Sequence, residues 1–116
     1  MTIERKHTGP RMSQIVIHGD TVYLAGQVAS DAPGQPAGAQ MSDILGHIDA
    51  LLAEAGSDKT KILSATIWLS DIRDFSAINE VWDTWVPEGH TPARACVEAK
   101  LAMTKYTVEV GVIAAR

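Results

Sequence analysis

The sequence predicts an α+β domain in which a mixed β-sheet carries two helices packed on one face. Two segments, residues 41–55 and 74–85, repeat apolar residues at the 3.6-residue spacing of a helix. Other segments alternate apolar and polar residues, as half-buried strands do; these are residues 14–18, 21–28, 62–69, 93–99 and 107–113. The 116 residues suffice for one core, so we expect a single domain over residues 1–116. Because two helices cover only one face, the other face must contact water or another copy of the chain.

Composition and charge narrow the range of partners. The net charge is −4 and the ten Lys and Arg residues are scattered, so the chain lacks the basic stripe that binds nucleic acid. No apolar run reaches the length that spans a membrane, and the N-terminal residues lack the apolar core of a signal peptide. We therefore expect neither nucleic acid nor membrane as a partner, and a cytoplasmic location. The lone Cys96 forms no internal disulfide, which fits a reducing compartment.

The first element is a predicted hairpin. Gly19 and Asp20 join the strands at residues 14–18 and 21–28, and glycine at the first of two loop positions favours a type II′ turn. Gly26 lies inside the second strand, where glycine usually marks a bulge or a close backbone contact. Residues 30–38 contain two prolines and two glycines, which predicts a loop.

The two helices have clear apolar stripes. The first is closed by Gly56, a typical C-terminal residue in the left-handed conformation, and its stripe consists of Met41, Ile44, Leu45, Ile48, Leu51, Leu52 and Ala55. His47 lies off this stripe and is interpreted as a surface histidine. In the second helix Asp71 or Asp74 is the expected N-cap, and the stripe consists of Phe75, Ile78, Trp82 and Trp85.

The strand between the helices has two different faces. Its apolar face is predicted to be the inner one and consists of Leu63, Ala65, Ile67 and Leu69. Ser64, Thr66 and Trp68 form the other face, which carries no charge. A polar and aromatic but uncharged surface is typical of a protein–protein interface, so we expect the uncovered face of the sheet to associate.

The two C-terminal strands concentrate the reactive side chains. Ala93, Ala95, Val97 and Ala99 share one face of the first strand, which leaves Arg94, Cys96 and Glu98 on the other. In the second strand Val108, Val110 and Val112 share a face, which leaves Thr107, Glu109 and Gly111. The pattern predicts that a guanidinium, a thiol and one or two carboxylates lie together on the uncovered face.

These segments resemble the YjgF/RidA family of reactive-intermediate (enamine/imine) deaminases. The resemblance extends over nearly the whole chain and rests on Thr91–Glu98 (TPARACVE), Val108–Val110 (VEV), Ala25–Val28 (AGQV), Leu51–Gly56 (LLAEAG), Asp74–Phe75 and Asn79. It implies a chorismate-mutase-like fold that forms a homotrimer, with three pockets between neighbouring subunits. The chain departs from the family where Gly9-Pro10 is followed by Arg11-Met12, since a tyrosine often follows there and reaches the pocket.

The resemblance assigns a role to each candidate residue. It implies that Arg94 holds a substrate carboxylate through two parallel hydrogen bonds, and that Glu109 positions the water that attacks a C=N bond. Gly26 would let its backbone approach the ligand, and Cys96 would line the pocket without acting as a nucleophile. Residue chemistry alone leaves alternatives open: Arg94 could form a structural ion pair with Glu98 or Glu109, and Glu109 could be an interface hydrogen-bond acceptor.

Three functions are compatible with this site. The first is hydrolysis of enamines and imines such as 2-aminoacrylate, released by pyridoxal-phosphate dehydratases, to 2-keto acids and ammonia. The second is binding of 2-keto acids or other small carboxylates without turnover, and the third, RNA cleavage, is disfavoured by the acidic charge. No cofactor is implied, and no metal site is expected because His7, His18 and His90 lack ligand spacing.

Overall fold

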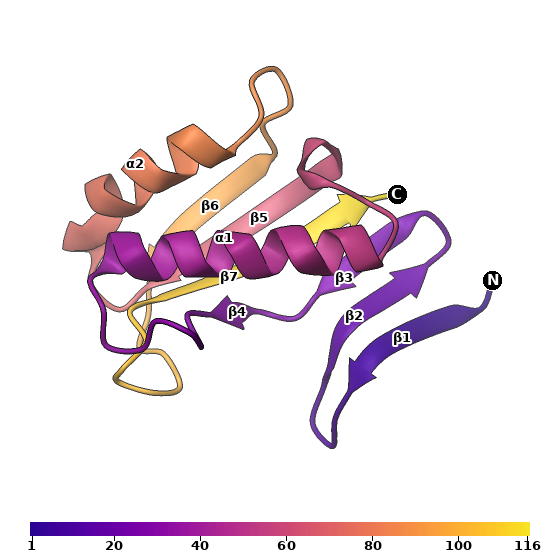
Figure 1. Ribbon diagram of the computed structural model, residues 1–116, viewed down its shortest axis with the longest axis horizontal. Coiled ribbons are helices and arrows are strands. Elements are labelled where there is room, and N and C mark those ends of the chain that lie inside the picture. The colour runs from indigo at the N-terminus through magenta and orange to yellow at the C-terminus, as the bar shows by residue number, and fades with distance from the viewer.

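The computed structural model describes residues 1–116 and has the predicted α+β architecture. Seven strands form one sheet in the order β1-β2-β3-β7-β5-β6, with β4 paired to β7. The sheet is mixed because β5 and β6 are parallel and the other pairs are antiparallel. Both helices lie on the same face of this sheet (Figure 1). The elements are β1 Ile3–Thr8, β2 Ser13–His18, β3 Thr21–Leu24, β4 Gln27–Val28, α1 Ala37–Glu54, β5 Ile62–Leu69, α2 Phe75–Trp85, β6 Ala93–Glu98 and β7 Val108–Ala115.

The N-terminal strand β1 was not predicted from the sequence. It pairs with β2 from Ile3 opposite His18 to Thr8 opposite Ser13, at the edge of the sheet. Five of its six residues are exposed. Periodicity did not reveal it because the ladder of backbone hydrogen bonds, and not burial, holds an edge strand of this kind.

The predicted hairpin is present with its turn. Gly19 has a φ of 61°, and Asp20 has no positive φ, a combination that matches type II′. The second strand is shorter than predicted, since β3 ends at Leu24 and the chain resumes as β4 only at Gln27. The break falls at Gly26, as the glycine inside a strand indicated.

The helices bury most of their predicted stripes, but Phe75 at the start of α2 is 40% exposed, and both helices differ from the prediction at their starts. Helix α1 begins at Ala37, so the last two residues of the predicted loop are helical, and Gly56 follows it with a φ of 77°. Asp71 caps a short 3-10 turn before α2 by accepting a hydrogen bond from the backbone N–H of Arg73 (2.9 Å). Asp74 occupies the N-cap position of α2 without a side-chain hydrogen bond.

The core lies between the helices and the sheet. In β5, Ala65, Ile67 and Leu69 are buried as predicted, but Leu63 is 53% exposed. The prediction for Leu63 is wrong because a bulge between Ile62 and Ser64 shifts the alternation, and Ile62 is buried in its place. The largest fully buried side chains include Ile15, Ile17, Met41, Ile44, Leu45, Ile48 and Leu52.

The opposite face of the sheet carries no helix (Figure 1). It presents large apolar side chains to solvent, and Tyr23, Val97 and Ile113 are 44%, 47% and 37% exposed. Register places them on the same side as Thr66 and Trp68, which are half-buried. Neither helix is long and apolar enough to cross a lipid bilayer.

Candidate functional site

Arg94 and Glu109 lie on opposite faces of the sheet, which corrects the prediction that they share one. Residues paired across neighbouring strands point to the same side. Ala65 of β5 pairs with both Arg94 and Val112, and Val112 is buried under the helices, so Arg94 lies on the helix side. Trp68 pairs with Glu109, which places Glu109 on the open face.

The facing of β6 is reversed because α2 covers this strand with aromatic rings. The guanidinium carbon Cζ of Arg94 lies 5.2 Å from the centre of the Trp82 ring and 5.8 Å from that of Phe75. Such cation–π contacts stabilise a guanidinium on an aromatic wall. The residues predicted to face inward are instead exposed, namely Ala93, Ala95 and Val97.

Arg94 has no anionic partner within the chain. It forms no ion pair and no hydrogen bond, and its Nη1 atom is buried without a partner. Glu98 accepts a hydrogen bond from the backbone N–H of Ile72 (2.9 Å), and Glu109 is on the other face, so the predicted ion-pair alternative is not formed in the chain. Asn79 on α2 also has a buried oxygen, Oδ1, without a partner. The guanidinium is therefore held by packing and its charge is uncompensated.

Cys96 shares the helix side with Arg94 and packs against the core. Burial raises the pKa of its thiol, and the nearby Arg94 charge only partly opposes this. A thiol whose pKa is raised carries little thiolate at neutral pH, and thiolate is the nucleophilic form. This environment disfavours covalent chemistry at Cys96, and its place in a pocket wall stays a prediction.

Glu109 lies against Gly26 at the edge of a groove on the open face. A Cβ atom added to Gly26 would lie 2.3 Å from Oε2 of Glu109, so only glycine leaves room for this carboxylate. The predicted close backbone contact at Gly26 is therefore a contact with Glu109. The groove has a volume of about 650 Å³ and is lined by Met12, Gln14, Gly26, Gln27, Val28, Ser30, Ala102 and Glu109.

A hydrogen bond between two glutamine side chains, which the sequence did not predict, links β2 to β4. The side chain of Gln27 donates hydrogen bonds to Oε1 of Gln14 (2.9 Å) and to the backbone oxygen of Ala25 (3.0 Å). Gln27 is the first residue of β4 and directly follows the break between β3 and β4. No local pattern indicates this hydrogen bond, because the two residues are 13 positions apart and become neighbours only through the hairpin.

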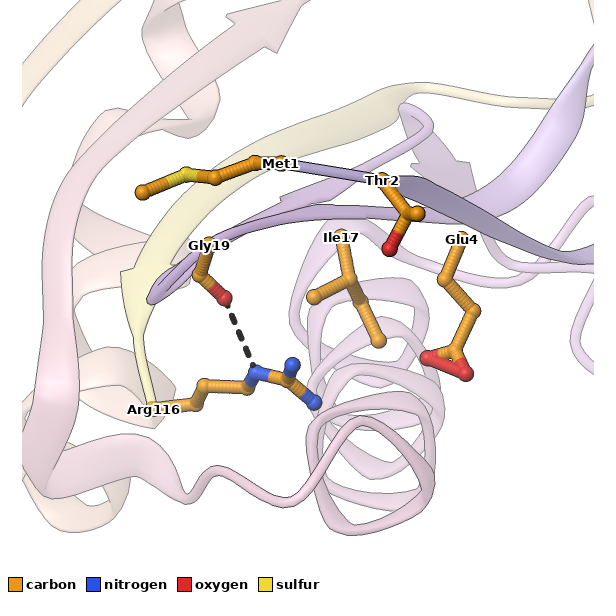
Figure 2. A pocket seen from close by; sticks show the side chains of 6 residues that line it. All are labelled: Met1, Thr2, Glu4, Ile17, Gly19 and Arg116. Atoms are coloured by element: carbon orange, nitrogen blue, oxygen red, sulfur yellow. Dashed lines mark hydrogen bonds between the residues drawn. The ribbon is translucent and has the colours of Figure 1, made fainter.

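A second hollow lies where the two chain ends meet (Figure 2). Arg116 and Glu4 line it from opposite sides of Ile17, and Nε of Arg116 donates a hydrogen bond to the backbone oxygen of Gly19 (3.2 Å). The hollow is at the C-terminal end of β7, whereas Glu109 is near the start of that strand. It adds no group to the pair formed by Arg94 and Glu109.

Arg94 and Glu109 of one chain cannot contact the same small molecule. The helix side offers a cation without an anion, and the open face offers a carboxylate at the edge of a groove. The sheet separates them, so a molecule that contacts both groups needs a second copy of the chain. Such a pair of groups could hold a carboxylate and activate a water beside it.

Comparison with known proteins gives full-length matches. The family described as Endoribonuclease L-PSP matches residues 3–116. A RutC family protein of Haemophilus influenzae is 45% identical, with 98% of each chain covered. The 2-iminobutanoate/2-iminopropanoate deaminase of Rattus norvegicus is 33% identical over 88% of this chain and 77% of its own. The crystal structure of NMB1025, a YjgF family protein of Neisseria meningitidis, is 44% identical with a TM-score of 0.96, and the match covers 100% of this chain and 96% of the other.

Proposed function

Because this chain belongs to the YjgF/RidA family, we propose that it hydrolyses reactive enamines and imines of the 2-aminoacrylate type. The imine form takes up one water and yields a 2-keto acid and ammonia. The observation that carries the proposal is Arg94, a guanidinium held on aromatic rings with no anion of its own chain beside it. A waiting cation of this kind suits a substrate that carries a carboxylate.

In the proposed complex Arg94 holds the substrate carboxylate. Its Nη1 atom is buried, so the two parallel hydrogen bonds come from Nε and Nη2. The contacts of the guanidinium with the rings of Trp82 and Phe75 restrict its position before the substrate arrives, which lowers the entropy cost of binding. Cys96, on the same face, lines the pocket next to the clamp.

Glu109 acts on the water. Attack on the C=N carbon requires that a proton leave the water and that the departing nitrogen gain one, and a carboxylate within hydrogen-bond reach can transfer it. The missing Cβ of Gly26 leaves the space in which this carboxylate sits. The groove beside it, with a volume of about 650 Å³, gives the substrate access.

The site requires more than one subunit, and we propose a homotrimer with three pockets between neighbours. Each pocket takes Arg94 from one copy and Glu109 from the next, because one chain holds them on opposite faces. The exposed apolar side chains of the open face, Tyr23, Val97 and Ile113, are the surface that association would bury. We place the protein in the cytoplasm, where such imines are released. Sedimentation showing a monomer at micromolar concentration would remove the shared pocket.

The alternative function uses the same pocket for binding without turnover. The relative at 45% identity carries only the name RutC family protein, whereas a relative named as a deaminase is 33% identical. In this reading Arg94 binds the carboxylate of a 2-keto acid, and Glu109 fixes the orientation of the ligand without transferring a proton.

One assay separates the two functions. The protein is added to a serine or threonine dehydratase reaction, and release of the keto acid from the imine is followed. Catalysis predicts faster release, its loss in Glu109→Gln, and survival of 2-ketobutyrate binding in that variant. If the wild-type protein binds 2-ketobutyrate but does not accelerate release, the binding function is the correct one.

A further inference from the structure

His47, interpreted from the sequence as a surface histidine, is half-buried and faces two carboxylates. Asp43 and His47 are four residues apart on α1 and share one face of the helix. Asp31 reaches the same point from the connection between β4 and α1. The Nε2 atom of His47 lies 3.2 Å from Oδ2 of Asp43 and 3.2 Å from Oδ2 of Asp31. The ligand atoms of the three residues all lie within 4.8 Å of one another.

The same nitrogen faces a third oxygen. The hydroxyl of Ser30 lies 3.4 Å from Nε2 of His47. Because Nε2 carries at most one hydrogen, it cannot make good hydrogen bonds to all three oxygens. A cation at the centre would satisfy the nitrogen and the oxygens at the same time.

The spacing and the donor types suit a transition metal. Zn²⁺ binds imidazole nitrogen at about 2.0–2.1 Å and carboxylate oxygen at about 2.0–2.2 Å, so the edges of its coordination tetrahedron are about 3.3 Å. The two separations from Nε2 of His47 to the carboxylates, 3.2 Å each, match these edges, and the two carboxylate oxygens lie within 4.8 Å of each other. Imidazole is the commonest metal ligand in proteins, and carboxylates complete such sites.

We infer that Asp31, Asp43 and His47 form a binding site for one Zn²⁺ ion, with the Ser30 hydroxyl or a water as fourth ligand. Two ligands are held in place before the ion arrives, since the side chains of Asp43 and His47 are 18% and 28% exposed. The backbone N–H of Asp31 donates a hydrogen bond to Asp43 (3.1 Å) and fixes that carboxylate further. Asp31, 75% exposed, supplies the third ligand from the solvent side.

The ion would fasten the connection that leads into α1. Ser30 also lines the groove beside Glu109, so the metal would stiffen one wall of that groove without touching Arg94 or Glu109. The inference is independent of the proposed function, because Asp31, Asp43 and His47 include neither Arg94 nor Glu109.

The test is a zinc titration of the full-length protein after treatment with a chelator. Calorimetry should show one saturable Zn²⁺ per chain, and the melting temperature should rise with added Zn²⁺. His47→Gln and Asp31→Asn should each weaken this binding by at least about tenfold. Asp31→Asn serves as the second variant because an exposed side chain can be changed without unfolding the core.

His7→Gln is the matched control. His7 also contacts a carboxylate, Glu54, at 2.6 Å, but that pair lacks a second carboxylate. This variant should therefore bind Zn²⁺ as the wild-type protein does. The inference is overturned if no saturable binding is seen, if binding is unchanged in both His47→Gln and Asp31→Asn, or if it is lost in His7→Gln.

Discussion

Adding one methyl group at Gly26 should disable catalysis while leaving the fold and ligand binding in place. In Gly26→Ala the new Cβ would lie 2.3 Å from Oε2 of Glu109, whereas real Cβ contacts are essentially never shorter than 3.0 Å. The carboxylate must therefore retreat by at least 0.7 Å, and by about 1.1 Å to reach an ordinary contact of 3.4 Å. A displacement of this size in a reacting group can lower the rate about 100-fold, which corresponds to about 2.7 kcal/mol of activation free energy.

The stability of the variant should change little. Gly26 does not have a positive φ, so alanine can adopt its backbone conformation. The atom that must move is the end of a flexible side chain, and the loss of glycine's freedom in the unfolded chain stabilises by roughly 0.4–1 kcal/mol. Binding of 2-ketobutyrate should survive because the substitution leaves unchanged the Arg94 guanidinium of the neighbouring copy, which holds the ligand carboxylate in the proposed pocket.

The assay is the dehydratase-coupled release of keto acid, run beside a binding titration and a thermal melt. Gly46→Ala is the control, since a Cβ at that exposed helical position meets no atom within 4 Å. It should leave activity unchanged and stabilise α1 by roughly 0.8–1.0 kcal/mol. If Gly26→Ala keeps full activity, then the contact does not position a catalytic carboxylate and the reasoning about Glu109 is wrong.

Three further predictions follow from other contacts. Arg94→Lys should lose about 1.5–3 kcal/mol of the free energy of keto-acid binding. Arg94→Ala should melt within a few degrees of the wild-type protein, because no carboxylate of the chain loses a partner. A large fall in its melting temperature would indicate a structural ion pair. Gln40 is fully buried, and its amide contacts Gln35, Lys105 and Thr107, so Gln40→Leu should lower the free energy of unfolding in urea by roughly 1–3 kcal/mol. The hydrogen bonds from Arg73 lower the pKa of Asp71 to about 2. The Asp71 carboxylate should therefore stabilise the native state above its unfolded pKa of about 3.9, and this contribution should be lost as the pH falls through about 2. A carboxyl NMR titration of the wild-type protein and of Arg73→Ala checks this.

Apolar periodicity predicted the elements whose burial is one-sided. The sequence predicted most of the apolar stripes of both helices, the inner face of β5 beyond its bulge and the glycines at turns. Each of these features depends on residues that are close in sequence. The same method failed for β6. There Ala93, Ala95 and Val97 look like the inner face, but they are small or exposed, and the inner face includes a charged residue.

The sequence predicted which residues form the candidate site but not how they are arranged in space. Arg94, Glu109, Gly26 and Cys96 were named from the chain, and the contact between Gly26 and Glu109 agrees with the expectation for a glycine inside a strand. The opposite facing of Arg94 and Glu109 was not predictable, because it depends on the aromatic rings that α2 places over β6. The cluster at His47 was also missed, although Asp43 and His47 at helical spacing were a signal that could have been followed.

The separation of Arg94 and Glu109 by the sheet has a consequence for genetics. In the proposed trimer, a substitution of Arg94 or of Glu109 that is present in all three copies would disable all three pockets. The two substitutions would nevertheless affect different subunits at each pocket. Suppose that Arg94→Ala and Glu109→Gln chains assemble together in equal amounts. About one pocket in four then receives an intact Arg94 from a Glu109→Gln chain and an intact Glu109 from an Arg94→Ala chain. Two inactive alleles would then complement each other, whereas a chain carrying both substitutions would rescue neither.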